Sequence, residues 1–232
     1  DYYLIDGSIY GDLQNPFPKG VETSAKAKKE LISATLNDFE EMVKNPSDKS
    51  VYSPKLFNKY FKIYQEHKYP YTLYLTTIER LVVLKEILKN PRKMIAISKS
   101  SSNNDIFHSN MPDIAIFDKY TQKEGISKVI RKKVSKDINT TFPVFDEFFK
   151  DLKFTIFYLR LADYKNVLKV ELPYEASMAE IEEIASKLKK FSTNGYPYLL
   201  KKAHNDVVIS DKNIKELINI AKVREKSGRE ML

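Results

Sequence analysis

A carboxylate near the start of the chain is the first residue whose position suggests chemistry. Asp6 follows the apolar pair Leu4-Ile5 and precedes a Gly-Ser pair, inside a strand expected over residues 2–9. Burying a carboxylate is costly unless it has a partner or a metal ion. Asp6 is therefore either a ligand for a cation or an aspartate that caps the turn after the strand, and its spacing alone leaves both open.

Two other side chains have types and positions that suggest chemistry. His204 lies four residues after Leu200 and three before Val207, on the helix face expected to look inward. A histidine there is either a satisfied core residue or a metal ligand. Lys99 directly follows a short apolar run and begins a Ser/Asn-rich stretch, where a lysine either holds a phosphate or is simply solvated.

Glu171 is a fourth candidate. It alternates with Lys169 within Val167–Leu172, so the two charged side chains share one face of an expected strand. The favoured interpretation is a solvated sheet face that carries an ion pair, ahead of a catalytic role.

The composition limits the function classes. The chain has 232 residues, of which 42% are hydrophobic and 30% charged, which is typical of a globular protein. It has no run of 18 apolar residues, which rules out a membrane span. We also expect no membrane partner and a cytoplasmic location. It has no cysteine, which excludes thiolate catalysis and Cys–zinc sites, and three histidines leave any metal site mostly oxygen-ligated. Since 39 Lys and Arg outnumber 31 Asp and Glu, giving +8, a polyanionic partner is favoured.

The elements that must position these residues form an α/β pattern, expected as one domain over residues 1–232. Expected strands cover residues 2–9, 94–98, 154–161 and 167–172, with a further strand at 114–117. The strands at 154–161 and 167–172 flank Ala162-Asp163-Tyr164 and are expected to form a hairpin. Expected helices cover residues 24–44, 54–66, 71–89 and 211–222, with one that Ser177 and Glu180 cap and one that carries Leu200 and His204. Residues 11–20 are expected to form a loop, and 105–153 resist placement. These elements predict a mixed β-sheet flanked by helices.

Six segments in order resemble the NurA family of DNA-end nucleases. They are Ile5-Asp6-Gly7-Ser8, Ile97-Ser98-Lys99-Ser100-Ser101, Met111 to Phe117 with Gly125, Phe157 to Leu161, Val170 to Pro173, and Gly195-Tyr196-Pro197 leading to Ala203-His204-Asn205. Each segment is weak alone, but together they span nearly the whole chain. The last one is the most specific.

This resemblance implies an RNase H-like fold and a nuclease, exonuclease or endonuclease, that resects the ends of DNA double-strand breaks for recombination. It implies that Asp6 and His204 hold Mn²⁺ or Mg²⁺, that Tyr196 is an active-site tyrosine, and that Lys99 contacts phosphate. The implied partners are single- and double-stranded DNA, a second copy of the chain, and a HerA-type hexameric ATPase.

The chain also departs from the family pattern. The family site holds two aspartates on strands and a glutamate on a helix between them, whereas this chain offers one Asp-Gly-Ser strand. The chain opens in this strand without an initiating Met. We interpret Asp6 as the second aspartate and expect the first aspartate and the glutamate upstream of residue 1.

Two other function classes stay open. One is a non-catalytic DNA-binding or adaptor module on the same fold, which fewer than three carboxylates near Asp6 would favour. The other is a structural subunit whose Tyr- and Phe-rich helices dock a partner protein through a large apolar patch. The basic charge argues against the second.

Overall fold

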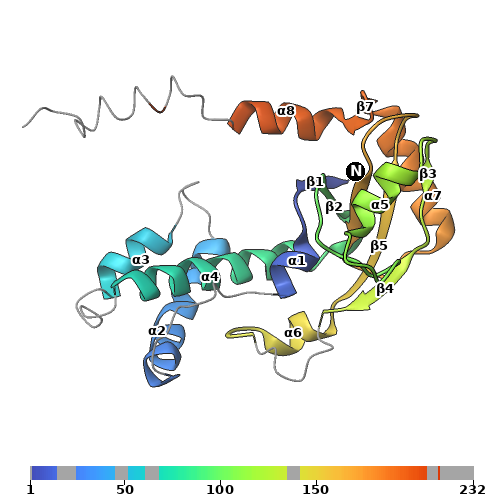
Figure 1. The fold of residues 1–232 in the computed structure, drawn as a ribbon. Helices are drawn as coiled ribbons and strands as arrows, with labels where there is room; N and C mark the ends of the chain where they lie inside the picture. Colours follow the sequence, from blue (N-terminus) through green and yellow to red (C-terminus); the bar gives the residue numbers. More distant parts are fainter. Residues whose placement is uncertain are drawn as a thin grey trace, which may run out of the picture.

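The computed structural model describes residues 2–14, 25–44, 52–60, 68–134, 142–207 and 214 (Figure 1). The helices are α1 (Ile9–Gln14), α2 (Ala25–Lys44), α3 (Ser53–Tyr60), α4 (Lys68–Ile87), α5 (Asp113–Tyr120), α6 (Asp146–Asp151), α7 (Met178–Lys190) and α8 (Tyr198–Val207), with a 3₁₀ turn at Pro91–Lys93. The strands are β1 (Tyr3–Asp6), β2 (Met94–Ser98), β3 (Gly125–Ile126), β4 (Ile130–Lys133), β5 (Lys153–Arg160), β6 (Leu168–Leu172), β7 (Ser192–Thr193) and β8 (Tyr196–Pro197). None of the helices in these ranges is long and apolar enough to cross a bilayer.

The main sheet is mixed, as the sequence predicts. Its strands follow the order β1-β2-β6-β5-β3, and β4 also pairs with β5. Strands β1 and β2 are parallel, which requires a long crossover, and helices α1 to α4 lie between them in the chain. The other pairs are antiparallel. The pairing places Asp6 beside Ile97, at the end of the edge strand.

Helices cover both faces of this sheet. Strand β2 is accordingly apolar on both sides. Met94 and Ala96 belong to the core that contains α1, α2 and α4. Ile95 and Ile97 belong to the core on the opposite face, with α7 and with Leu200 of α8 (Figure 1). A continuously buried run is typical of a central strand with both faces covered. The fold class is therefore α/β, with a mixed sheet flanked by helices.

Several expected elements are confirmed. The predicted hairpin is β5 and β6, and the capping box is present, since Ser177 Oγ accepts the Glu180 N–H and Glu180 Oε2 accepts the Ser177 N–H. The predicted strand at 94–98 is β2, and the helices predicted over 24–44, 54–66 and 71–89 correspond to α2, α3 and α4, with residues 24 and 61–66 outside the described residues. The expected helix at 211–222 lies outside the described residues except for Ile214.

Three expected elements differ in the structure. The strand expected over residues 2–9 ends at Asp6, and Ile9 and residues 11–14, the latter expected in a loop, belong to α1, whose buried Ile9, Tyr10 and Leu13 have helical spacing. Residues 15–20 of the expected loop lie outside the described residues. Residues 114–117, expected as a strand, belong to α5, where Ile114 and Phe117 lie three positions apart and pack in the same apolar cluster. A four-residue apolar run fits a strand and a buried helix turn equally well, so local pattern could not separate the two.

Candidate active site

Asp6 lies exposed at the carboxyl end of β1, where the chain turns from the sheet into α1. The Gly7 N–H donates to the Ile97 carbonyl at 2.9 Å, which extends the β1–β2 pairing one residue past Asp6. Gly7 has a φ of +134°, a conformation that favours glycine. The backbone on both sides of Asp6 is therefore fixed, which holds its carboxylate at the edge of the sheet.

Tyr196 of β8 contacts this carboxylate. Its hydroxyl donates to Asp6 Oδ1 at 3.3 Å. Burial and the adjacent Asp6 carboxylate raise the pKa of Tyr196 to about 12, so the hydroxyl stays protonated and remains a donor at neutral pH. Lys99 Nζ lies 4.2 Å from the centre of the Tyr196 ring, a cation–π contact. The structure thus brings three predicted site residues together.

A tight hairpin places Tyr196. Asn194 and Gly195 have φ values of +54° and +76°, and they form the turn between β7 and β8. An Asn-Gly pair is the strongest short-range signal for such a turn, so this hairpin could have been predicted from the sequence. A Cβ on Gly195 would lie 2.5 Å from Lys165 Cβ, so this hairpin packs closely against the turn between β5 and β6.

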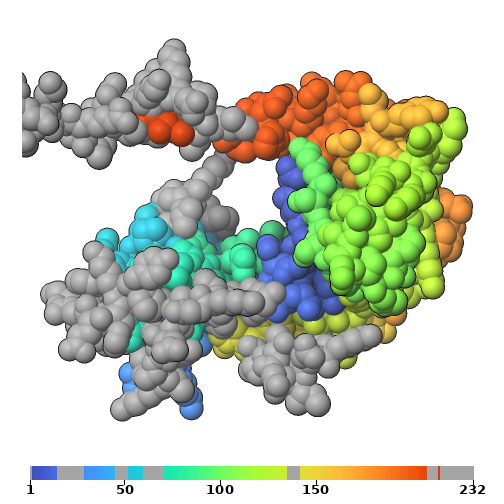
Figure 2. All heavy atoms as spheres, viewed as in Figure 1, coloured from blue at the N-terminus to red at the C-terminus, as the bar shows by residue number. Residues whose placement is uncertain are grey.

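A cavity of about 430 Å³ lies beside Tyr196, and His204 of α8 lines it together with Lys99. His204 is exposed, and Leu200 is the buried residue of α8, so the expectation that His204 faces the core is wrong. Figure 2 shows the reason, since α8 stands out from the body of the sheet and only its first turns meet it. The apolar pattern of α8 identified a face, but most of that face has no core beside it.

The described residues form an incomplete metal site. A carboxylate oxygen is a ligand that Mg²⁺ and Mn²⁺ accept, and exposed Asp6 offers one. Among the described ranges no three His, Cys, Asp or Glu side chains gather closely enough to hold a metal ion. Asp6 therefore fits as one ligand, and further ligands are needed.

Glu171 is not on a solvated face. Its side chain is 0% exposed and that of Lys169 is 1% exposed, and Lys169 Nζ lies 2.7 Å from Glu171 Oε1. The predicted ion pair is therefore present, but the predicted solvation is wrong. The two residues lie on β6, between β2 and β5 at the centre of the sheet, and the N-terminus of α1 covers Glu171.

Glu171 fixes the segment that follows Asp6. Its carboxylate accepts the Ser8 hydroxyl at 2.5 Å and the Tyr10 backbone N–H at 2.9 Å. Ser8 Oγ in turn accepts the Gly11 N–H at 2.8 Å, so it caps α1 while it donates to Glu171. A buried charge thus holds the Ser8 side chain and the Tyr10 backbone, two and four residues beyond Asp6.

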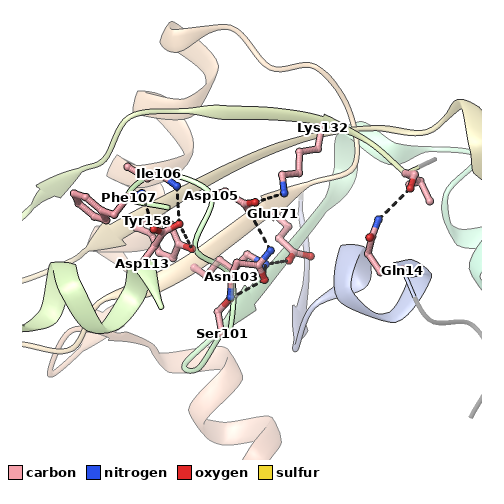
Figure 3. Close-up of polar contacts among 12 residues, drawn as sticks. Gln14, Ser101, Asn103, Asp105, Ile106, Phe107, Asp113, Lys132, Tyr158 and Glu171 are labelled. Atoms are coloured by element: carbon pink, nitrogen blue, oxygen red, sulfur yellow. Dashed lines mark hydrogen bonds and ion pairs between the residues drawn. The ribbon is translucent and has the colours of Figure 1, made fainter. Parts of the chain in front are cut away.

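The same network reaches the segment after Lys99. Lys169 Nζ donates to Asn103 Oδ1 at 3.3 Å, and Asn103 Nδ2 donates to Asp105 Oδ2 at 3.0 Å (Figure 3). Lys132 Nζ pairs with Asp105 at 2.5 Å. Burial opposes ionisation of Asp105, but hydrogen bonds from Lys132 and Asn103 outweigh it and lower the pKa of that carboxyl. A chain of polar contacts therefore links the two segments that carry Asp6 and Lys99.

Asp113 stabilises the rest of the segment that follows Lys99. Its fully buried carboxylate accepts the backbone N–H groups of Ile106 and Phe107 at 3.0 and 3.1 Å. The Tyr158 hydroxyl approaches it at 3.4 Å, and burial with the nearby Asp113 charge raises the pKa of Tyr158. Part of the region that the sequence left unplaced therefore supports the loop beside the site.

Comparisons with known proteins agree with this fold. A family model described as the NurA domain matches residues 1–209. A DNA double-strand break repair nuclease NurA from Sulfurisphaera tokodaii is 31% identical over 225 residues, which cover 96% of this chain and 59% of that protein. A probable nuclease of the same name from Methanocaldococcus jannaschii is 29% identical over 256 residues, covering 100% of this chain and 61% of that protein. The chain spans less than two thirds of the length of these relatives.

Solved structures show the same architecture. The crystal structure of the NurA nuclease from Sulfolobus solfataricus superposes with a TM-score of 0.66 at 25% identity, over 97% of this chain and 60% of that one. A crystal structure of NurA bound to dAMP and manganese gives a TM-score of 0.60 at 15% identity, over 97% of this chain and 70% of that one, a likeness of fold.

Proposed function

The chain belongs to the NurA family, and on that premise we propose that it acts in a metal-dependent deoxyribonuclease that processes DNA ends in double-strand-break repair. The proposal rests chiefly on one observation: a carboxylate at a strand end, bonded by a tyrosine, lies beside a cavity lined by cations. Phosphodiester hydrolysis needs an acidic group for a metal ion and basic groups for the substrate's phosphates. This site offers both.

Each predicted residue has a distinct role in this proposal. Asp6 holds the metal ion, and Tyr196 orients the Asp6 carboxylate by donating to one of its oxygens. Lys99 neutralises a phosphate oxygen, and the ring of Tyr196 restrains the Lys99 ammonium group. His204 either binds the metal ion or accepts and releases a proton at the edge of the cavity.

The proposed metal is Mn²⁺ or Mg²⁺. When bound, such an ion lowers the pKa of a coordinated water and stabilises the leaving oxygen. Asp6 supplies an oxygen ligand, and a NurA structure of this fold contains manganese, which supports the choice. Since no three such ligands gather among the described residues, at least one further ligand has to come from elsewhere in the protein.

Other parts of the proposal rest on family resemblance. They are a single nuclease domain with an RNase H-like fold, homodimer formation, a HerA-type hexameric ATPase as partner, action on single- and double-stranded DNA, and a cytoplasmic location. Size-exclusion chromatography with light scattering and co-purification with the ATPase test the two assembly claims. A monomer that never co-purifies would contradict both.

The test of the activity is degradation of end-labelled linear DNA with and without Mn²⁺. We expect Mn²⁺-dependent cleavage that Asp6→Asn lowers at least about 100-fold, the scale on which loss of one charge-stabilising group lowers catalysis. The control is Asp12→Asn, which removes an exposed carboxylate of α1 that pairs only distantly with Arg80, at 3.9 Å. Equal losses in both variants would count against a special role for Asp6.

One specific observation favours an alternative function. No cluster of three metal-ligating side chains exists within the described ranges, which is what a non-catalytic DNA-binding or adaptor module predicts. That module would bind DNA in every variant and cleave it in none. The same assay, read together with binding, separates the two functions.

A further inference from the structure

The cavity beside Tyr196 holds more positive charge than the proposed catalytic roles use. Besides Lys99 and His204, it is lined by Lys165 from the β5–β6 turn and by Lys201 from α8. No Asp or Glu lines it. Its three lysines give its walls three formal positive charges, with no negative one.

These lysines differ from most others in the described part of the chain. Many exposed lysines there pair with a carboxylate, as Lys123 does with Asp163 at 2.8 Å. Within the same residues, Lys99, Lys165 and Lys201 have no such ion pair. Gathering three uncompensated ammonium groups around one cavity costs repulsion, and an anion in that cavity relieves the cost.

Close backbone packing fixes the relative positions of the segments that line the cavity. The stem of Lys165 packs against Gly195, where even a methyl group would collide, so the β5–β6 turn and the β7–β8 hairpin have a fixed separation. Amide side chains of Asn166 and Asn205 add hydrogen-bonding groups to the walls. At about 430 Å³, the cavity falls within the range of ligand sites.

We propose that this cavity binds the sugar–phosphate backbone of a DNA strand. It holds the phosphates next to the reacting phosphate at Asp6, and Lys165 and Lys201 are its anchoring cations. Tyr196 separates the two places, since its hydroxyl faces Asp6 while its ring and Lys99 form a wall of the cavity. A strand whose reacting phosphate lies at Asp6 therefore continues over Lys165 and Lys201. This inference rests on the proposed function and adds the path of the substrate.

The test measures binding of a labelled single-stranded oligonucleotide against salt, without divalent metal, so that cleavage plays no part. Each phosphate contact contributes a slope of about 0.7 in log affinity against log salt for single strands. We expect Lys165→Gln and Lys201→Gln each to reduce the slope by about 0.7, and the double variant by about 1.4. Glutamine keeps the stem that packs on Gly195 while removing the charge.

Lys202→Gln is the matched control, because Lys202 is an exposed neighbour on α8 that does not line the cavity. A double variant whose slope equals that of Lys202→Gln would overturn the proposal. Retention of the slope in Lys165→Arg would support a charge effect over a loss of folding. If these variants reduce the slope but the protein never cleaves DNA, the result would support the binding site and contradict the proposed nuclease activity.

Competition with inorganic phosphate and with a deoxynucleoside monophosphate separates a strand site from a site for free phosphate. A strand site predicts affinity that rises as the oligonucleotide lengthens beyond one nucleotide, with weak competition from both small anions. Affinity independent of length, with strong competition by phosphate alone, would overturn the strand assignment.

Discussion

Replacing Glu171 with glutamine tests whether the buried ion pair holds the site segment. The amide keeps the shape but has a single acceptor oxygen, so it can accept from Ser8 or from Tyr10 and not from both, and Lys169, 1% exposed, loses its counter-charge. Removing one partner of a buried pair costs about 3–5 kcal/mol, because the other charge stays buried without compensation. That is a large share of the roughly 5–15 kcal/mol by which domains are stable.

The second variant separates charge from packing. In Lys169→Met with Glu171→Gln neither charge remains, while an acceptor for Ser8 is kept. We expect the double variant to be more stable than Glu171→Gln alone, with a coupling free energy of about 2–3 kcal/mol between the sites. Glu183→Gln, which breaks an exposed ion pair with Lys187, is the control and should change stability little.

The assay is urea unfolding followed by both circular dichroism and fluorescence, so that a two-state transition can be checked. Hydrogen exchange at the Tyr10 amide, which donates to Glu171, gives a local readout of the segment after Asp6. A loss below about 1 kcal/mol in Glu171→Gln, or a double variant no better than the single one, would refute the reasoning.

Three further changes have defined outcomes. Gly195→Ala should destabilise the protein by at least about 1–2 kcal/mol in urea unfolding, because φ is +76° and the new Cβ would meet Lys165, whereas equal stability would contradict this packing. Tyrosinate absorbance in an alkaline titration reports ionisation of Tyr196, and unfolding at each pH reports its effect on stability. The stability contributed by neutral Tyr196 should be complete below pH 10.0 and lost as pH rises through about 12. Tyr196→Phe should lack this loss, and a profile that matches that of the unaltered protein would argue against the Asp6 contact. Ser177→Ala should cost about 1 kcal/mol by removing the cap of α7, and an unchanged unfolding midpoint would contradict the capping box.

Local pattern was enough to predict much of the fold. The apolar run of β2, the hairpin of β5 and β6 and the capping box at Ser177 each depend on neighbours in the chain, so the sequence identified them. The mixed direction of the sheet was predicted for the same reason. Helix α5 was missed because four apolar residues carry too little periodicity to distinguish a helix from a strand.

The site was harder to predict than the fold, because the residues in contact there are far apart in the sequence. Ser8 and Glu171 are 163 positions apart, and no local pattern indicates that one donates to the other. His204 was placed inward because amphipathic spacing reports which face is apolar, and it does not report whether a core lies beside that face. The proximity of Asp6, Lys99 and Tyr196 is observed, whereas their catalytic roles stay predictions.

The most direct test of the central claim measures cleavage and binding of linear DNA by Asp6→Asn in parallel. We predict that Mn²⁺-dependent cleavage falls at least about 100-fold while affinity for DNA, measured without metal, stays close to that of the unaltered protein. Asp6 is exposed, so the fold should tolerate the change. Cleavage by Asp6→Asn at the unaltered rate would contradict the assignment of Asp6 and with it the proposed active site.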